Sequence, residues 1–183
     1  MSTQVVTISA EATPNPNTVK LNVGRVLLER GVLNYTSPER ARESLLASRL
    51  FENDAIAGVM IGRDFISLTK KPEAQWADVA PEVDTIRELL ESGETLFPER
   101  PAERDETASE IERRIREVLD RDIRPAVAMD GGDIEFYSFD DGVVTLHLQG
   151  ACGSCPSSAL TLKMGVENRL RQLIPEVKEV VQI

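Results

Sequence analysis

Cys152 and Cys155 are the two cysteines of the chain, and their spacing suits two kinds of chemistry. Two thiols three positions apart form a redox disulfide, or their thiolates bind a metal. A tetrahedral zinc site or a four-thiolate iron–sulfur cluster takes about four ligands. Because one copy of the chain supplies two thiolates, a four-thiolate site built on this motif also predicts a dimer.

The cysteine segment, Ala-Cys-Gly-Ser-Cys-Pro, lies between a strand-like run and a helix-like run. We expect a strand over residues 143–149 and a helix that begins at Pro156. The N-terminus of a helix carries unsatisfied N–H groups and a partial positive charge, and both stabilise a thiolate. This position suits metal binding and redox chemistry equally, so it does not decide between them.

Three functions stay open on these residues. A thioredoxin-like dithiol/disulfide oxidoreductase also has such a motif between a strand and a helix, but that fold needs more elements after the helix than the residues following Cys155 supply. The second function is a zinc site between two chains, for which the chain offers no second Cys/His pair. The third is an iron–sulfur cluster held by both cysteines of each of two chains.

Composition narrows the class of protein. The net charge of −10 disfavours a nucleic-acid partner, because such binding depends on Lys and Arg meeting phosphates. No run approaches the roughly 18 apolar residues of a membrane span, so we expect no membrane partner. Residues 1–10 lack a basic region and no arginine precedes Arg25, which predicts a cytoplasmic protein. In a reducing cytosol two cysteines favour metal binding or catalysis over a structural disulfide.

The sequence predicts an α+β protein of two small α/β domains. Residues 98–108 contain two prolines, several charges and no large apolar residue, which is typical of a solvated linker. It separates a first domain, residues 1–97, from a second, residues 109–183. The first domain contains no cysteine, no histidine and no glycine loop suited to phosphate.

Local patterns predict the elements of the first domain. Ser37 and Pro38 are a helix N-cap and a first helical residue, and this helix extends to about Phe51. Gly62-Arg63 reads as a tight hairpin turn, and Trp76 as a core or subdomain anchor. The other expected elements are strands over 4–10, 18–23, 56–61 and 64–70, and a helix from about Pro81 that stops at Gly93.

The second domain has the predicted order α-β-β-α-β. Ser109 caps its first helix, and Pro125 helps to end that helix. Asp130-Gly-Gly-Asp133 reads as a turn with capping carboxylates. The strands over 134–139 and 143–149 flank a hairpin at 140–142, the second helix extends to Pro175, and a strand over 177–183 closes the domain.

A histidine and a group of arginines in the second domain are further candidates for a functional role. His147, the single histidine, lies opposite Leu146 and Leu148 by alternation, so we expect it at an exposed or half-buried strand position and not as a metal ligand. A group of arginines forms either a solvated face or a surface that meets an acidic partner or offsets the negative charge of a cluster. Its members are Arg113, Arg114, Arg116, Arg121 and Arg124.

Four motifs of the second domain are Arg124-Pro125, Met129-Asp-Gly-Gly-Asp133, the run 148–158 around the cysteines, and Ile174-Pro-Glu-Val177. With these motifs, residues 119–181 resemble the NifU C-terminal domain, the Nfu-type iron–sulfur scaffold and carrier. The first domain, with Thr13-Pro-Asn-Pro-Asn17 and the run 62–69, resembles the Nfu N-terminal domain. One departure is Leu45, where that domain often has proline.

This resemblance implies a function. It implies a [4Fe–4S] cluster, or a [2Fe–2S] cluster, that bridges a homodimer and is passed to apo iron–sulfur proteins after receipt from a cluster donor. The family's cluster ligands correspond to Cys152 and Cys155, and the role is that of a carrier and not of an enzyme.

Overall fold

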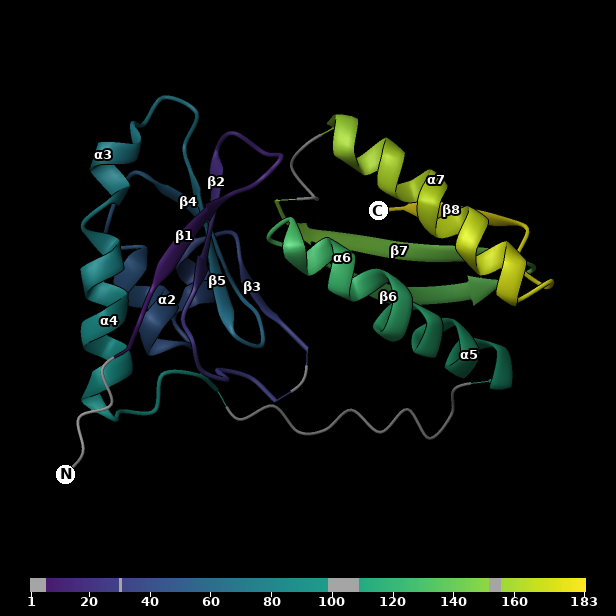
Figure 1. The fold of residues 1–183 in the computed structure, drawn as a ribbon, viewed down its shortest axis with the longest axis horizontal. Coiled ribbons are helices and arrows are strands. Elements are labelled where there is room, and N and C mark those ends of the chain that lie inside the picture. Colours follow the sequence, from purple (N-terminus) through teal and green to yellow (C-terminus); the bar gives the residue numbers. More distant parts are fainter. Residues whose placement is uncertain (1–5, 30, 99–108, 152–155) are drawn as a thin grey trace. The chain divides into compact units, whose positions relative to one another are not determined.

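The computed structural model describes residues 6–29, 31–98, 109–151 and 156–183 (Figure 1). The chain divides into two compact units, residues 1–101 and 102–183. Each unit packs helices on a β-sheet, so the predicted α+β fold class is confirmed. The predicted linker, 98–108, falls outside the described residues except for Pro98, and it stays a prediction.

Unit 1 contains an antiparallel sheet whose order, within the described residues, is β1-β2-β5-β4-β3. Its strands are β1 (Ser9–Ala12), β2 (Thr18–Asn22), β3 (Leu33–Tyr35), β4 (Ile56–Ile61) and β5 (Phe65–Lys70). The hairpin predicted at Gly62-Arg63 is confirmed, because Ile61 pairs with Ile66 on the neighbouring strand. The first strand is shifted from the predicted range 4–10 toward the next turn, and the sequence patterns missed β3.

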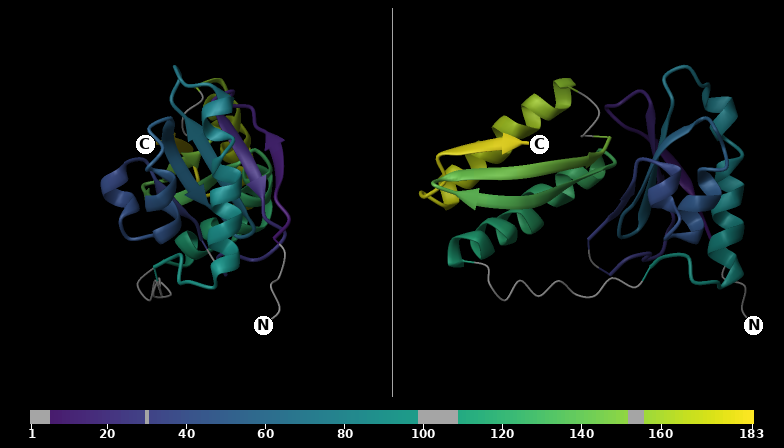
Figure 2. Two further views of the ribbon diagram at one scale, coloured as in Figure 1. Left: turned by 90° about the vertical axis from the view of Figure 1, so that its left-hand side faces the viewer. Right: turned by 180° about the vertical axis from the view of Figure 1, so that it is seen from behind.

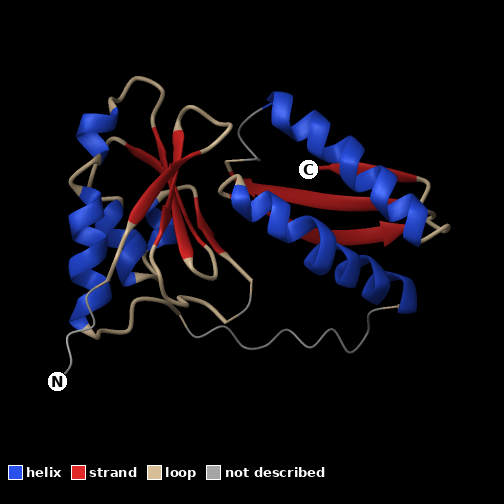
Figure 3. Ribbon diagram, in the orientation of Figure 1, coloured by secondary structure: helices blue, strands red, loops and turns tan. Residues whose placement is uncertain are grey.

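Helices cover one face of this sheet (Figures 1 and 3). They are α1 (Pro38–Ala41), α2 (Leu45–Leu50), α3 (Trp76–Val79) and α4 (Glu82–Ser92). Leu50 of α2 and Ile86 of α4 belong to the same buried cluster as Leu68 of the sheet. The helix predicted to end at Gly93 is confirmed as α4.

The single helix predicted over 38–51 is wrong, because the chain breaks between α1 and α2. The Ser44 hydroxyl accepts a hydrogen bond from the Ala47 N–H (3.2 Å) and donates one to the Leu96 carbonyl (2.9 Å). Ser44 is therefore a buried N-cap that starts a new helix. Leu45 is the first residue of that helix, which is a position that suits proline.

Of the two roles predicted for Trp76, that of a core anchor is wrong, because 39% of its surface is exposed. The Lys70 ammonium lies 5.6 Å from the centroid of its ring. The ring is thus in reach of a cation–π contact and is not part of the buried apolar cluster of unit 1.

Unit 2 follows the predicted order α-β-β-α-β. Its elements are α5 (Glu110–Val118), η1 (Leu119–Ile123), α6 (Arg124–Met129), β6 (Gly132–Asp140), β7 (Val143–Gly150), α7 (Pro156–Leu173) and β8 (Glu179–Gln182). β7 pairs with β6 antiparallel and with β8 parallel. Seen from behind in Figure 2, the strands lie in front of the helices, so α5, α6 and α7 cover the same face.

The first helix of unit 2 begins as predicted and continues beyond the predicted end. Ser109 and Glu112 form a reciprocal capping box. Pro125 does not end the helix, because a π-helical segment precedes it: the Arg124 N–H donates to the Leu119 carbonyl. Pro125 then occupies the first turn of α6, where a missing N–H costs little.

The core of unit 2 joins the sheet to all its helices. Val144, Leu146 and Leu148 are buried on one face of β7, as their alternation predicts. They belong to one cluster with Val166 and Leu170 of α7. Truncating a buried leucine of this kind to alanine costs about 2–5 kcal/mol. This packing fixes both elements that flank the cysteine segment.

Candidate functional site

The predicted ligands, Cys152 and Cys155, lie outside the described residues, and their roles stay a prediction. The structure describes both flanks of the segment: β7 ends at Gly150 and α7 begins at Pro156. The cysteines thus join the end of a central strand to the start of an 18-residue helix. The helix dipole favours negative charge at this end.

A glycine turn lies directly against the strand end that leads into Cys152. Gly132 pairs with Gly150 between β6 and β7, and the Ala151 N–H donates to the Gly131 carbonyl (3.3 Å). Gly131 and Gly150 have φ angles of 73° and 67°, a region that L side chains rarely adopt. The residue before Cys152 is therefore held by the backbone of the glycine turn.

Asp133 has a different role from the predicted turn cap. It lies in β6, where its buried carboxylate accepts a hydrogen bond from Arg124 Nε (2.9 Å). Arg124 Nη2 also donates to the Ile134 carbonyl (2.9 Å), and Nη1 pairs with Asp120. Burial raises the pKa of Asp133, and the charge of Arg124 opposes this rise.

His147 lies on the exposed face of β7, as predicted. Its Nδ1 is 3.5 Å from Nε2 of Gln149, which also donates to the Glu135 carboxylate (2.8 Å). Within the described ranges, no group of three or more His, Cys, Asp or Glu side chains is placed to hold a metal ion. The same ranges contain no helix with the length and apolar character to cross a bilayer.

The predicted arginine group is used largely within unit 2. Arg114 Nη2 donates to the Leu173 carbonyl (3.0 Å), and the Arg116 guanidinium lies 4.7 Å from the Phe136 ring centroid. Arg121 pairs with Asp122 (2.7 Å). Arg114, Arg116 and Arg124 thus contact other parts of unit 2, which was not predicted, while Arg113 and Arg121 are exposed as on a solvated face.

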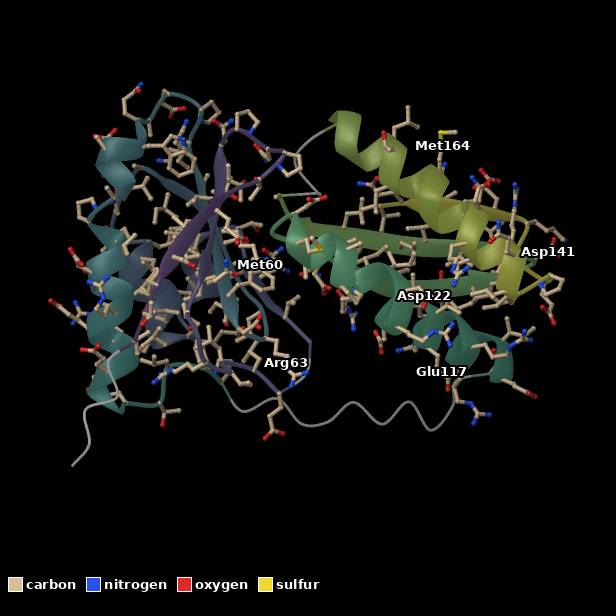
Figure 4. The ribbon with its side chains drawn as sticks, viewed as in Figure 1. Met60, Arg63, Glu117, Asp122, Asp141 and Met164 are labelled. Atoms are coloured by element: carbon tan, nitrogen blue, oxygen red, sulfur yellow. The ribbon has the colours of Figure 1, made fainter. Side chains whose placement is uncertain are left out.

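Large apolar side chains are exposed on two helices of unit 2. Leu160 and Met164 of α7 are 63% and 60% exposed, and Met129 at the end of α6 is 73% exposed. Leu160 and Met164 are four residues apart, so they lie on one helical face. Figure 4 shows Met164 pointing away from the sheet. This face was not predicted from the sequence, although both residues lie off the apolar stripe formed by Leu162, Val166 and Leu170.

Models of two protein families match the chain. Residues 8–93 match the model described as scaffold protein Nfu/NifU N terminal, and residues 115–181 match the NifU-like domain. These matches fall in unit 1 and unit 2, respectively.

Relatives match across both units. The human "NFU1 iron-sulfur cluster scaffold homolog, mitochondrial" is 40% identical over 96% of this chain and 71% of its own length. The Drosophila willistoni protein of the same name is 40% identical over 100% of this chain and 65% of its own length. "NifU-like protein 5, mitochondrial" of Arabidopsis thaliana is 38% identical over 96% and 67%. The chain thus spans about two thirds of the length of these relatives.

Solved structures also match parts of the chain. The solution structure of a NifU-like protein from Saccharomyces cerevisiae is 28% identical, with a TM-score of 0.47, over 55% of this chain and 92% of that one. The crystal structure of a Staphylococcus aureus protein is 25% identical, with a TM-score of 0.39, over 43% and 95%.

The relatives' names correct the predicted cytoplasmic location, because the human, fruit-fly and Arabidopsis proteins are all named mitochondrial. The prediction rested on the composition of residues 1–24, which contain no arginine, and that composition does not decide a compartment. The two family models and the 40% identity to the human protein over 96% of this chain lead to one conclusion: the chain belongs to the Nfu/NifU-like family of iron–sulfur cluster scaffold proteins.

Proposed function

We propose that two copies of this chain hold one [4Fe–4S] cluster between them and pass it to apo iron–sulfur proteins. The observation that carries the proposal is the position of the Cys152–Cys155 segment between the end of β7 and the start of α7, in a chain of this family. The partial positive charge of the helix start stabilises thiolates and the negative cluster that they bind.

The ligand count supports a homodimer. A four-thiolate cluster takes about four cysteines, and each chain contains two. The exposed pair Leu160 and Met164 offers apolar surface on the helix that follows the cysteines. Residues 156–166 include one charged side chain, Lys163, so two copies meet little like-charge repulsion there despite the net charge of −10.

Transfer in this proposal is a ligand exchange and not a redox reaction. Thiolates of the recipient replace Cys152 and Cys155 on the iron atoms, and the two chains keep their thiolates. The cluster is cargo, so the chain acts as a carrier and not as an enzyme. A cluster donor restores the loaded dimer in a second exchange.

Anaerobic reconstitution tests the proposal. The wild-type chain should acquire iron and acid-labile sulfide in equal amounts, with the broad visible absorption of a thiolate-bound cluster. The loaded protein should then restore activity to an apo [4Fe–4S] enzyme, and the double variant Cys152→Ser/Cys155→Ser is the control. A colourless protein with a reversible disulfide between the two cysteines would support the oxidoreductase, and bound zinc without sulfide would support the zinc site.

A further inference from the structure

Arg124 makes a three-way junction in unit 2. From the start of α6 its guanidinium group binds Asp120 in η1, the Asp133 carboxylate (2.9 Å) and the Ile134 carbonyl (2.9 Å). Its planar fork of donors suits such a junction, because each N–H bond has a fixed direction. The Asp133 side chain is 4% exposed and that of Arg124 is 33% exposed, so water screens this pair less than it screens a fully exposed ion pair.

The junction closes a loop of the chain. Arg124 and Asp133 are the two ends of a segment that contains α6 and the glycine turn at Gly131. Glycine residues supply little stiffness of their own, since their φ and ψ angles are the least restricted of any residue. The ion pair therefore fixes the separation of the two ends and limits the conformations open to the turn.

Two backbone contacts extend from this loop to the cysteine segment. Gly132, beside Asp133, pairs with Gly150, and the Gly131 carbonyl accepts the hydrogen bond from the Ala151 N–H. Ala151 is buried and directly precedes Cys152. Through Asp133 and Ile134, Arg124 thus holds the turn that these residues contact.

We infer that Arg124 is a positioning residue, which fixes Ala151 through the glycine turn and thereby slows the loss of the bound cluster. The first half of the inference rests on the contacts of unit 2 alone. The second half rests on the proposed function. A fixed Ala151 reduces the freedom of the neighbouring ligand, and a ligand that moves less leaves the metal less often.

The test compares Arg124→Gln with a matched control, Arg169→Gln. Arg169 makes an ion pair of the same kind with Asp122 (2.9 Å), which joins α7 to η1 away from the glycine turn. Amide hydrogen exchange of Ala151 is measured in the apo full-length chain, and cluster loss to an iron chelator is measured in the loaded chain. Both measurements are made well below the thermal midpoint of every variant.

Arg124→Gln should accelerate exchange at Ala151 by about tenfold, and cluster loss by a similar factor, because the turn loses a charge-assisted anchor. Arg124→Lys keeps the charge without the fork and should give intermediate rates. Arg169→Gln should lower the thermal midpoint and leave both rates near those of the wild type. If Arg124→Gln does not fold, Arg124→Lys provides the same two readouts.

The outcomes test separately whether Arg124 positions Ala151 and whether this slows cluster loss. If the amide of Ala151 exchanges at the wild-type rate in the Arg124 variants, Arg124 does not position Ala151. Accelerated exchange with unchanged cluster loss would overturn its effect on the cluster. A wild-type chain that takes up no cluster would refute the proposed function, while the exchange measurement would still decide whether Arg124 holds Ala151.

Discussion

Each cysteine should be indispensable to the proposed cluster. Cys152→Ala or Cys155→Ala removes two of about four ligands from a dimer, so neither variant should retain iron and sulfide after gel filtration. Iron and sulfide analysis measures the loss, and circular dichroism checks that the fold is kept. A single variant that keeps the wild-type iron content would show that the cluster does not need both thiolates.

His147, unlike the two cysteines, should be dispensable for cluster binding. Its ring is exposed on β7, with Nδ1 3.5 Å from the Gln149 amide. His147→Ala should therefore leave cluster content, visible spectrum and cluster lifetime at wild-type values. The measurement is the spectrum of the reconstituted variant beside the wild type. Loss of the cluster from a folded variant would make His147 a ligand and refute its assignment to a strand face.

At the scale of elements, Asp122 joins η1 to α7. Hydrogen bonding to Arg121 lowers the pKa of Asp122 to about 2, with a further contribution from Arg169 and against the effect of burial. A carboxyl group with a depressed pKa stabilises the fold above its ordinary pKa, and this stability is lost as pH falls toward the folded value. Asp122→Asn should therefore lower the urea midpoint at pH 7, and the difference from wild type should shrink between about pH 4 and pH 2.

Asp141 is the control for Asp122, and both are labelled in Figure 4. Its carboxylate pairs with Lys178 at 3.2 Å, but 93% of the Asp141 side chain is exposed. Exposed pairs contribute little, so Asp141→Asn should barely move the urea midpoint. An Asp122→Asn effect that is equally large at pH 2 and pH 7 would show that the charge of Asp122 is not its cause.

The elements also show where local sequence patterns suffice. Alternation along β7 and the cap at Ser109 depend on neighbouring residues, and both were predictable. The break at Ser44 depends on a hydrogen bond to Leu96, which is distant in sequence. The continuation past Pro125 depends on a π-helical segment that residue preferences do not indicate. The role of Asp133 required its partner Arg124, whose proximity comes from the packed fold.

At the scale of the whole molecule, we predict that the units divide the work. Residues 109–183 contain both cysteines, and unit 1 contains neither. The isolated 109–183 fragment should fold and assemble the cluster with the wild-type spectrum and stoichiometry. It should transfer that cluster more slowly at low recipient concentration, because unit 1 raises the local concentration of recipients or donors.

Transfer rates against recipient concentration measure this division. The deficit of the fragment should shrink as recipient concentration rises, since docking then limits the rate less. If the fragment and the full chain transfer the cluster at equal rates at low recipient concentration, unit 1 has no docking role. A fragment that folds but holds no cluster would show that unit 1 is needed for assembly.

The central claim is that one cluster is shared between two chains, and native mass spectrometry of the anaerobically loaded protein tests it most directly. The mass should correspond to a dimer with one [4Fe–4S] cluster, which is about two iron and two sulfide per chain. Removing the cluster with a chelator should shift the population toward monomer. A monomer that carries a complete cluster with about four iron would contradict the account.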